Sequence, residues 1–242
     1  MILQAASAAL GRLFTPPFRA VFFKTLGLTI LALIGLWFAI GGLFDVLALP
    51  PLQDLMPDLP AWAAWLGTIA TFVAGLTLAL GLGLLIAPVT AIIAGFFLDD
   101  VAEIVEREDY PQDPPGRALP LATAAIVSAK FLALVVLGNL VALLLLLVPG
   151  VNLVAFFVVN GYLLGREFFE FAAMRFRSEA EAKVLRRRNA GTVFGAGLLI
   201  AAVLSVPIVN LLAPLFAAAM MVHLHKLVSA RENRSTAAAR AS

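Results

Sequence analysis

Two stretches of the sequence, VPGVNLVA at residues 148–155 and VPIVNLLA at residues 206–213, repeat nearly the same eight residues 58 positions apart. Each lies in the middle of a long apolar run, where a helix that crosses a bilayer tolerates neither a proline nor an asparagine cheaply. Proline and asparagine together are typical of a tight turn between two helices. The repeat therefore predicts two helical hairpins. Their predicted tips are Pro149 and Asn152 in the first hairpin and Pro207 and Asn210 in the second.

The composition indicates a membrane protein. Of the 242 residues, 62% are hydrophobic and 13% are charged, and the mean hydropathy is +1.00. Soluble domains are about 45–50% apolar and about 25% charged, so a soluble domain of this length could not bury so many apolar side chains. The chain has no cysteine, which excludes disulfides and thiolate catalysis. Its net charge of +2, without interleaved basic and aromatic residues, does not indicate nucleic-acid binding.

The arms of both predicted hairpins are short for a membrane crossing. The turn divides the uncharged run 131–165 into about 18 and 13 residues, and the run 190–222 into about 16 and 13 residues. At about 1.5 Å per residue the shorter arms reach about 20 Å, whereas the hydrocarbon layer is about 30 Å thick. We interpret both runs as hairpins that enter the bilayer part-way and return. The alternative is an ordinary pair of spans joined by a short external loop.

Two other uncharged runs are long enough to cross. Residues 25–44 supply 20 residues, which is the length of one span. Residues 61–98 are uncharged for 38 residues, which is too long for one span and tight for two. We expect Pro88 to kink or end this helix, which places the second span at about 61–86, followed by a bent segment that leaves the membrane near Asp99.

The first twenty residues predict a short amphipathic helix at the membrane interface. Its expected lipid-facing residues are Ile2, Leu3, Leu10, Leu13 and Phe14. The predicted fold is thus an all-α integral membrane protein with two full transmembrane helices, two half-penetrating helical hairpins and an amphipathic N-terminal helix. These elements are expected to form a single membrane domain over residues 1–230, followed by a disordered cytoplasmic tail at 231–242.

Basic residues are unevenly distributed along the chain. Residues 45–60 contain three aspartates and no Lys or Arg, whereas residues 166–188 contain seven basic residues. The positive-inside rule therefore places 45–60 outside and both termini in the cytoplasm. Irregular backbone at membrane depth must be buried in protein or line a water-filled cavity. Because two spans could hardly cover two such hairpins, we expect a homo-oligomer with a solute path.

Six segments resemble, in their order and spacing, the CysZ-type sulfate permease family. They are PPFRAVFF (16–23), FLDDVAEIVE (97–106), VPGVNL (148–153), NGYLLGREFFEF (160–171), LRRRNAGTVFGA (185–196) and VPIVNLLAPLFAAAMMV (206–222). The resemblance covers about residues 10–228 and is that of a divergent, alphaproteobacterial-like member. It implies two spans, two half-penetrating hairpins, oligomeric assembly and multi-pass insertion in the bacterial inner membrane. The implied function is sulfate uptake for cysteine biosynthesis.

The solute stays open on this resemblance, because the eukaryotic branch of the same superfamily is linked to autophagy and stress. A transporter of another small anion and a non-transporting membrane scaffold or stress protein are the alternatives. An enzyme is not expected, since the sequence has no nucleophile–base arrangement, metal-ligand spacing or nucleotide-binding loop, and we predict neither a cofactor nor a metal. His223 and His225 are two residues apart and face nearly opposite sides of a helix.

The stretch FTPPFRAVFFK at residues 14–24 predicts an anion site. Thr15 is a suitable N-cap and Pro16 or Pro17 a suitable first helical residue, so the free N–H groups of Phe18 and Arg19 would point from a helix start beside a guanidinium. The family's motif here is a Gly–apolar–Arg series, often with a second Arg. This chain keeps Arg19 but has proline and alanine at the other two positions, and Lys24 is expected to substitute in part. Alternatively, Arg19 reaches lipid phosphate as an interfacial anchor.

The stretch LDDVAEIVERED at residues 98–109 predicts an acidic helix. Asp99, Glu103 and Glu106 fall on one stripe at about 100° per residue, and the apolar residues take the other side. A solvated acidic face is the simpler interpretation. In the family the matching glutamates lie near the proposed conduit, which implies a gate in which Glu103 and Glu106 pair with other charges. The predicted gate residues are Glu103, Glu106, Arg107 and Arg166, and the predicted partners of the two glutamates are Arg166 and the arginines at 186–188. Those three arginines are either positive-inside anchors or part of a cytoplasmic vestibule for anions.

Overall fold

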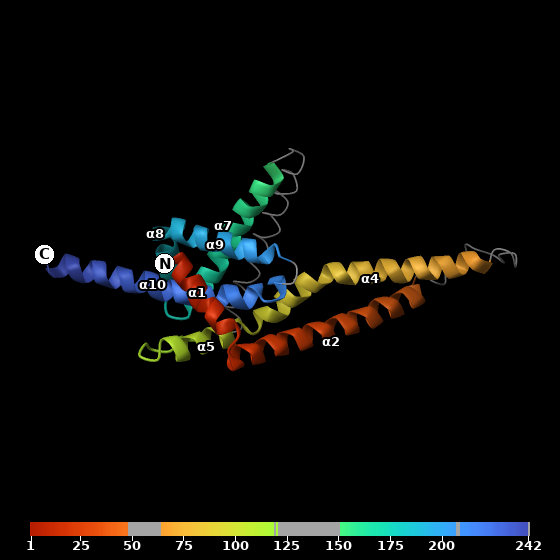
Figure 1. Ribbon diagram of the computed structural model, residues 1–242, viewed down its shortest axis with the longest axis horizontal. Coiled ribbons are helices and arrows are strands. Elements are labelled where there is room, and N and C mark those ends of the chain that lie inside the picture. Colours follow the sequence, from red (N-terminus) through yellow and green to blue (C-terminus); the bar gives the residue numbers. More distant parts are fainter. Residues whose placement is uncertain (48–63, 119, 121–150, 207–208, 242) are drawn as a thin grey trace. The chain divides into compact units, whose positions relative to one another are not determined.

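The computed structural model describes residues 1–47, 64–118, 120, 151–206 and 209–241, and every element in these ranges is a helix. Figure 1 shows α1 (Ile2–Leu13), α2 (Pro16–Leu47), α4 (Ala64–Gly95), α5 (Leu98–Asp109), α7 (Val151–Met174), α8 (Glu179–Arg188), α9 (Ala190–Leu204) and α10 (Ala213–Ala241), with a short 3-10 helix, η2 (Val209–Leu211), before α10. The all-helical fold expected from the sequence is confirmed for the described ranges.

The structure divides into two compact units. The first unit comprises residues 1–22 and 96–242, and the second comprises residues 23–95. The division falls inside α2, so most of α2 and all of α4 belong to the second unit. Helix α10 continues to Ala241, since residues 231–241 are rich in alanine, arginine and glutamate, which favour a helix.

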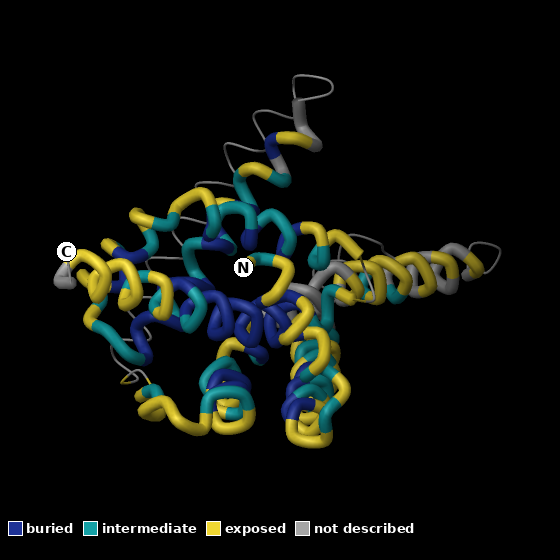
Figure 2. The backbone as a smooth tube through the Cα atoms, turned by 60° about the vertical axis from the view of Figure 1, so that its left-hand side comes forward, coloured by how far each residue is buried: buried dark blue, intermediate teal, exposed yellow. Residues whose placement is uncertain are grey.

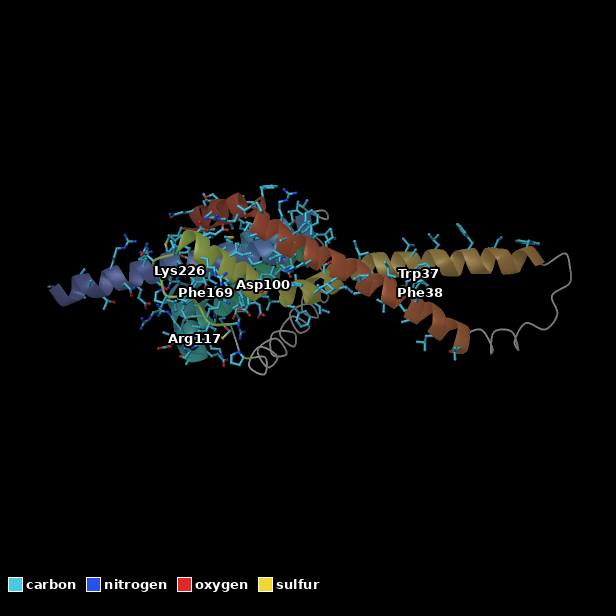
Figure 3. The ribbon with its side chains drawn as sticks, turned by 90° about the horizontal axis from the view of Figure 1, so that it is seen from below. Trp37, Phe38, Asp100, Arg117, Phe169 and Lys226 are labelled. Atoms are coloured by element: carbon cyan, nitrogen blue, oxygen red, sulfur yellow. The ribbon has the colours of Figure 1, made fainter. Side chains whose placement is uncertain are left out.

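Helix α2 is a long apolar helix with almost no protein around it. Its stretch Pro16–Leu43 is 28 residues long and apolar enough to cross a membrane, yet only 6% of its most apolar window is buried within the protein. Trp37 and Phe38, labelled on this helix in Figure 3, are 39% and 71% exposed. Such a surface is unfavourable in water and favourable in lipid. The predicted span 25–44 lies entirely within α2.

Helix α4 contains the second predicted span from Ala64 onward. We expected Pro88 either to kink this helix or to end it. The helix does not end at Pro88 but continues to Gly95. Its ribbon bends toward its C-terminal end (Figure 1), which agrees with the expectation of a kink, because proline removes one backbone hydrogen bond and its ring crowds the preceding turn. Among its described side chains, Phe72 is 71% and Leu80 is 63% exposed.

The core of the first unit is built around α10. All side chains from Ala213 to His225 are buried, so this part of the helix is enclosed on every side. It contacts α1, α5, α7 and α9, and it forms the dark blue run that follows the exposed C-terminal end in Figure 2. The stretch Ala213–Ala239 also has the length and apolar character of a span, but 72% of its window is buried inside the protein.

Helices α7 and α9 cross at glycines. A Cβ atom at Gly197 would overlap the carbonyl oxygen of Gly161 and come within 2.7 Å of the backbone nitrogen of Gly165. A Cβ atom at Gly165 would come within 2.6 Å of the carbonyl oxygen of Val193. The two backbones therefore approach each other more closely than side chains would allow, which is the typical use of small residues between membrane helices.

The second copy of the repeat separates two helices, as predicted. Helix α9 ends at Leu204, η2 includes Asn210, and α10 begins at Ala213. Pro207 and Pro149 lie outside the described residues, while Asn152 lies in the first turn of α7. The arms that follow the two turns are longer than their uncharged portions, because α7 continues past Arg166 to Met174 and α10 past His223 to Ala241.

Helix α1 is amphipathic, as predicted. Ala5, Ala6 and Ala9 are buried and the helix packs on α10. Of the residues expected to face lipid, Leu3, Leu10 and Phe14 are exposed, whereas Ile2 and Leu13 are half-buried. The Cδ1 atom of Ile2 lies close to Gly195 of α9, which explains why it is turned from the exposed side.

Candidate anion-binding site

The start of α2 has fewer free donors than the sequence suggested. The helix begins at Pro16, as predicted, but the backbone N–H of Arg19 donates to the carbonyl oxygen of Thr15 at 2.9 Å. The expectation of a free N–H at Arg19 is therefore wrong, because this group makes the first hydrogen bond of the helix. Pro16 and Pro17 have no N–H, so only Phe18 keeps the predicted donor role.

The side chains at this helix start point to different surroundings. Phe18 is fully buried, whereas the Arg19 side chain is exposed and makes no ion pair with a residue that the structure describes. Thr15 donates its hydroxyl to the carbonyl oxygen of Arg12 at 2.8 Å. Lys24 is exposed and belongs to the second unit, so it is not counted with Arg19 in one site. The structure thus offers an exposed guanidinium with one nearby backbone donor.

The acidic helix α5 is formed as predicted, but Glu106 is not on its solvated side. Val101, Ala102 and Val105 are fully buried, and Glu106 is only 4% exposed. Arg175 at the end of α7, itself 4% exposed, donates from Nε to Glu106 Oε1 at 2.6 Å and from Nη2 to Oε2 at 3.1 Å. The same guanidinium pairs with Asp99 through Nη1. Glu106 therefore pairs with Arg175 and not with the arginines expected from the sequence.

Burial and the neighbouring charges shift the pKa values of Arg175 and Asp99. Burial alone would lower the pKa of Arg175, but the hydrogen bonds and charges of Glu106 and Asp99 outweigh it and raise that pKa. Burial raises the pKa of Asp99, against the lowering effect of the Arg175 charge and hydrogen bond. The pair Glu106–Arg175 is thus a charged, hydrogen-bonded pair in the protein interior.

The segment 110–117 closes over this pair. The N–H of Gly116 donates to Glu106 Oε2 at 2.9 Å, and the N–H of Arg117 donates to the carbonyl oxygen of Arg175 at 2.8 Å. A Cβ atom at Gly116 would come within 2.8 Å of Glu106 Oε1, so a larger residue would collide with the carboxylate. Glu106 is held on two sides, which favours a structural role over a movable gate.

The four predicted gate residues are not brought together. Glu103 and Arg107 pair with each other across one helical turn on an exposed surface of α5. Glu106 is held by Arg175 as described above. Arg166 lies on α7, where its Nε atom is 3.5 Å from Glu170 Oε1. Arg186 of α8 donates from Nε to the same oxygen at 2.6 Å, so Arg166 and Arg186 meet at Glu170 and not at Glu103 or Glu106.

The sequence reasoning missed two groups of polar residues. Arg175 stands between apolar residues in the stretch FAAMRF, and Glu106 follows the buried Ala102 by four residues, so both positions point toward the core. The second group joins Arg12 of α1 to Asp109 at 2.9 Å, and the hydroxyl of Tyr110 to His223 Nδ1 at 2.9 Å. His223 and His225 have separate neighbours, since His225 stacks on Phe176.

The sequence matches a known protein family. The family described as sulfate transporter CysZ/etoposide-induced protein 2.4 matches the chain over residues 5–214. The chain belongs to that family. The match includes most of α1, the start of α2, the acidic helix, both copies of the repeat and the residues of the Arg166–Glu170–Arg186 contacts. A search among curated proteins found no match. Family membership and the exposed apolar helix α2 together indicate a membrane protein of sulfate-transporter type.

Proposed function

We propose that this protein is a permease or channel that carries sulfate across the bacterial inner membrane for cysteine biosynthesis. The observation that carries the proposal is the family match over residues 5–214. The exposed apolar surface of α2 supports a membrane location, and the basic side chains beside the hairpins suit an anionic solute. No catalytic reaction and no cofactor are part of this proposal.

The proposed topology follows the charge distribution. Spans 25–44 and 61–86 cross the bilayer, residues 45–60 face the periplasm, and both termini face the cytoplasm. The hairpins 131–165 and 190–222 enter only part-way, because the uncharged portion of their return arms is about 13 residues. Non-helical backbone at that depth must be covered by protein or water, so the protein is proposed to act as a homo-oligomer. A monomeric mass both in mild detergent and after crosslinking in native membranes would contradict the assembly.

In this proposal Arg19 binds the arriving oxyanion. Its exposed guanidinium offers several N–H donors in a planar fork, which suits a tetrahedral oxyanion, and the N–H of Phe18 adds a donor at the helix start. Sulfate or a similar oxyanion is therefore the expected solute.

The test is uptake by the purified protein in liposomes. We expect radiolabelled sulfate to enter vesicles that contain the protein, down its concentration gradient and without ATP. Empty vesicles should take up none. Unlabelled phosphate, chloride and a dicarboxylate serve as competitors. Uptake of one of these in preference to sulfate would identify a transporter for another anion. Absence of any anion flux from correctly oligomeric protein would leave the non-transporting scaffold as the function.

A further inference from the structure

Three charged side chains, those of Arg166, Glu170 and Arg186, lie together near the ends of the two uncharged runs that we interpret as hairpins. Arg166 directly follows the uncharged run 131–165, and Arg186 precedes the run 190–222 by only three residues. Both guanidinium groups approach one atom, Glu170 Oε1, at 3.5 Å from Arg166 Nε and 2.6 Å from Arg186 Nε. The side chain of Glu170 is only 10% exposed and that of Arg186 only 13%. The bases of both hairpins are therefore linked by one shared carboxylate.

The guanidinium groups keep donors that Glu170 does not use. Each arginine approaches Glu170 through its Nε atom, and neither donates from its Nη atoms to a residue in the described ranges. A guanidinium has five N–H donors in a fixed fork, whereas the single oxygen Oε1 can accept only a few of them. An anion with several oxygens, such as a tetrahedral oxyanion, could accept more of these bonds than Glu170 does.

The local charge also favours an added anion. Glu167 lies on the same helix, one turn before Glu170, and burial together with the charge of Glu170 raises the pKa of Glu167 to about 8, although the Arg166 charge opposes this. Glu167 is therefore mainly uncharged near neutral pH. Two guanidinium groups then share the single carboxylate of Glu170, so arginines outnumber their acidic partner in the cluster.

The other helices packed on α7 do not cancel this excess. Helix α9 has no charged or titratable residue from Ala190 to Leu204. Helix α10 brings His225 against Phe169 of α7, in an edge-on ring contact, and adds no carboxylate between Ala213 and Arg231. On α8, Lys183 is paired with Glu179. Within the described residues, no carboxylate other than that of Glu170 forms an ion pair with Arg166 or Arg186.

We propose that Arg166 and Arg186 form a second oxyanion site, in which the Glu170 carboxylate holds the position of the anion until a passing oxyanion displaces it. This inference rests on the proposed transport function and extends it by a site in series with Arg19. An internal competitor keeps the affinity of the site low, because the site is available only for the fraction of time that Glu170 is away. Conduction needs such weak binding, since an anion held tightly at one site would not leave it.

The proposal makes opposite predictions for the two partners. With purified full-length protein at pH 7, sulfate binding is measured by isothermal titration calorimetry in the Arg19→Ala background, so that the first site does not contribute. Glu170→Gln removes the competitor and should tighten the residual binding about 5-fold, because the site is then no longer closed by an internal carboxylate for most of the time. Arg186→Gln should weaken it about 10-fold by removing a charged donor. Arg187→Gln, an exposed neighbour, is the matched control and should change nothing.

Two further variants guard against misfolding. Glu170→Asp keeps the charge but shortens the reach to Arg186, so it should tighten sulfate binding by less than Glu170→Gln. Arg186→Lys should restore binding only in part, because an ammonium lacks the planar fork. Each variant is compared at equal oligomer size and thermal midpoint.

The outcomes separate this inference from the proposed function. If liposomes that contain the wild-type protein take up sulfate but the Arg19→Ala protein shows no residual sulfate binding, the second site does not exist. The same conclusion follows if Glu170→Gln and Glu170→Asp weaken the residual binding or leave it unchanged. If wild-type protein neither binds nor transports sulfate, the proposed function itself is wrong.

Discussion

The arginines of this chain occupy surroundings that differ in how much water reaches the guanidinium. Arg175 is enclosed with two carboxylates, Arg186 is mostly buried beside one, and Arg19 is exposed at a helix start. Water weakens a charged hydrogen bond, whereas burial strengthens it and makes the loss of one partner costly. The same residue type therefore serves stability at Arg175 and is available for an arriving anion at Arg19.

Replacement of Arg19 should reduce sulfate binding without changing the fold. Arg19→Ala removes an exposed guanidinium, so we expect about 10-fold weaker sulfate uptake at low concentration, with unchanged expression and oligomer size. Arg19→Lys should recover only part of the uptake. Uptake is measured in liposomes over a range of sulfate concentrations, with Arg187→Ala as control. A wild-type concentration dependence for Arg19→Ala would make Arg19 an interfacial anchor.

Neutralising Glu106 should destabilise the protein strongly. Glu106→Gln leaves the Arg175 guanidinium buried with too little negative charge, and losing one partner of a buried pair costs about 3–5 kcal/mol. Chemical denaturation in detergent measures the free energy of unfolding. Glu103→Gln is the matched control, because Glu103 pairs with Arg107 on an exposed surface, where a pair contributes about 0–1 kcal/mol. Equal losses in the two variants would disprove the structural role of Glu106.

The stability of the protein should depend on pH through Glu167. The pKa of Glu167 is raised to about 8 from its ordinary value of 4.5, so the folded state binds this proton more tightly than the unfolded state. Its stabilising contribution is complete below the unfolded pKa and is lost as pH rises through the folded pKa. Between pH 5 and about 8, wild-type stability should therefore fall relative to that of Glu167→Gln. Thermal midpoints of both proteins across this range provide the measurement, and parallel pH profiles would refute the assignment.

At the scale of elements, the crossing of α7 and α9 depends on glycines. Gly197→Ala places a methyl group against the Gly161 carbonyl and the Gly165 backbone, none of which is a flexible side chain, so the helices must separate. We expect a loss of about 1–3 kcal/mol in the free energy of unfolding, as for overpacking. Gly191→Ala on the same helix is the control, since a Cβ atom there would meet nothing within 4 Å. The same unfolding assay compares them, and equal stability of the two variants would contradict the close crossing.

The helices were largely predictable from the sequence, whereas the charged pairs were not. Uncharged runs predicted α2 and α4, the acidic stripe predicted α5, and the proline–asparagine repeat predicted the break between α9 and α10, because each of these features acts within one segment. The partner of Glu106 is 69 residues away, at Arg175, and no local pattern fixes which arginine approaches a given carboxylate. The missing donor at Arg19 has a local cause that could have been foreseen, since the fourth helical residue normally bonds the N-cap carbonyl.

At the scale of the whole molecule, the proposed topology can be tested by cysteine labelling, because the chain contains no cysteine. We expect Gln53→Cys to react with an impermeant maleimide added outside intact cells, since residues 45–60 lack basic residues. Arg187→Cys should react only after permeabilisation. Asn152→Cys and Asn210→Cys should react slowly from outside if the hairpins are half-penetrating. External labelling of these two as fast as that of Gln53→Cys would show full crossings.

The packing of α1 on α10 sets an order of events during synthesis on the ribosome. Helix α1 is complete at Leu13, but α10 begins only at Ala213, about 200 residues later. At about 5–20 residues per second, the nascent α1 waits roughly 10–40 s for the helix that covers its alanines. During that interval its apolar surface must rest on the bilayer or on an insertion factor. The exposed Leu3, Leu10 and Phe14 give the nascent helix a means of staying on the membrane until the chain behind it arrives.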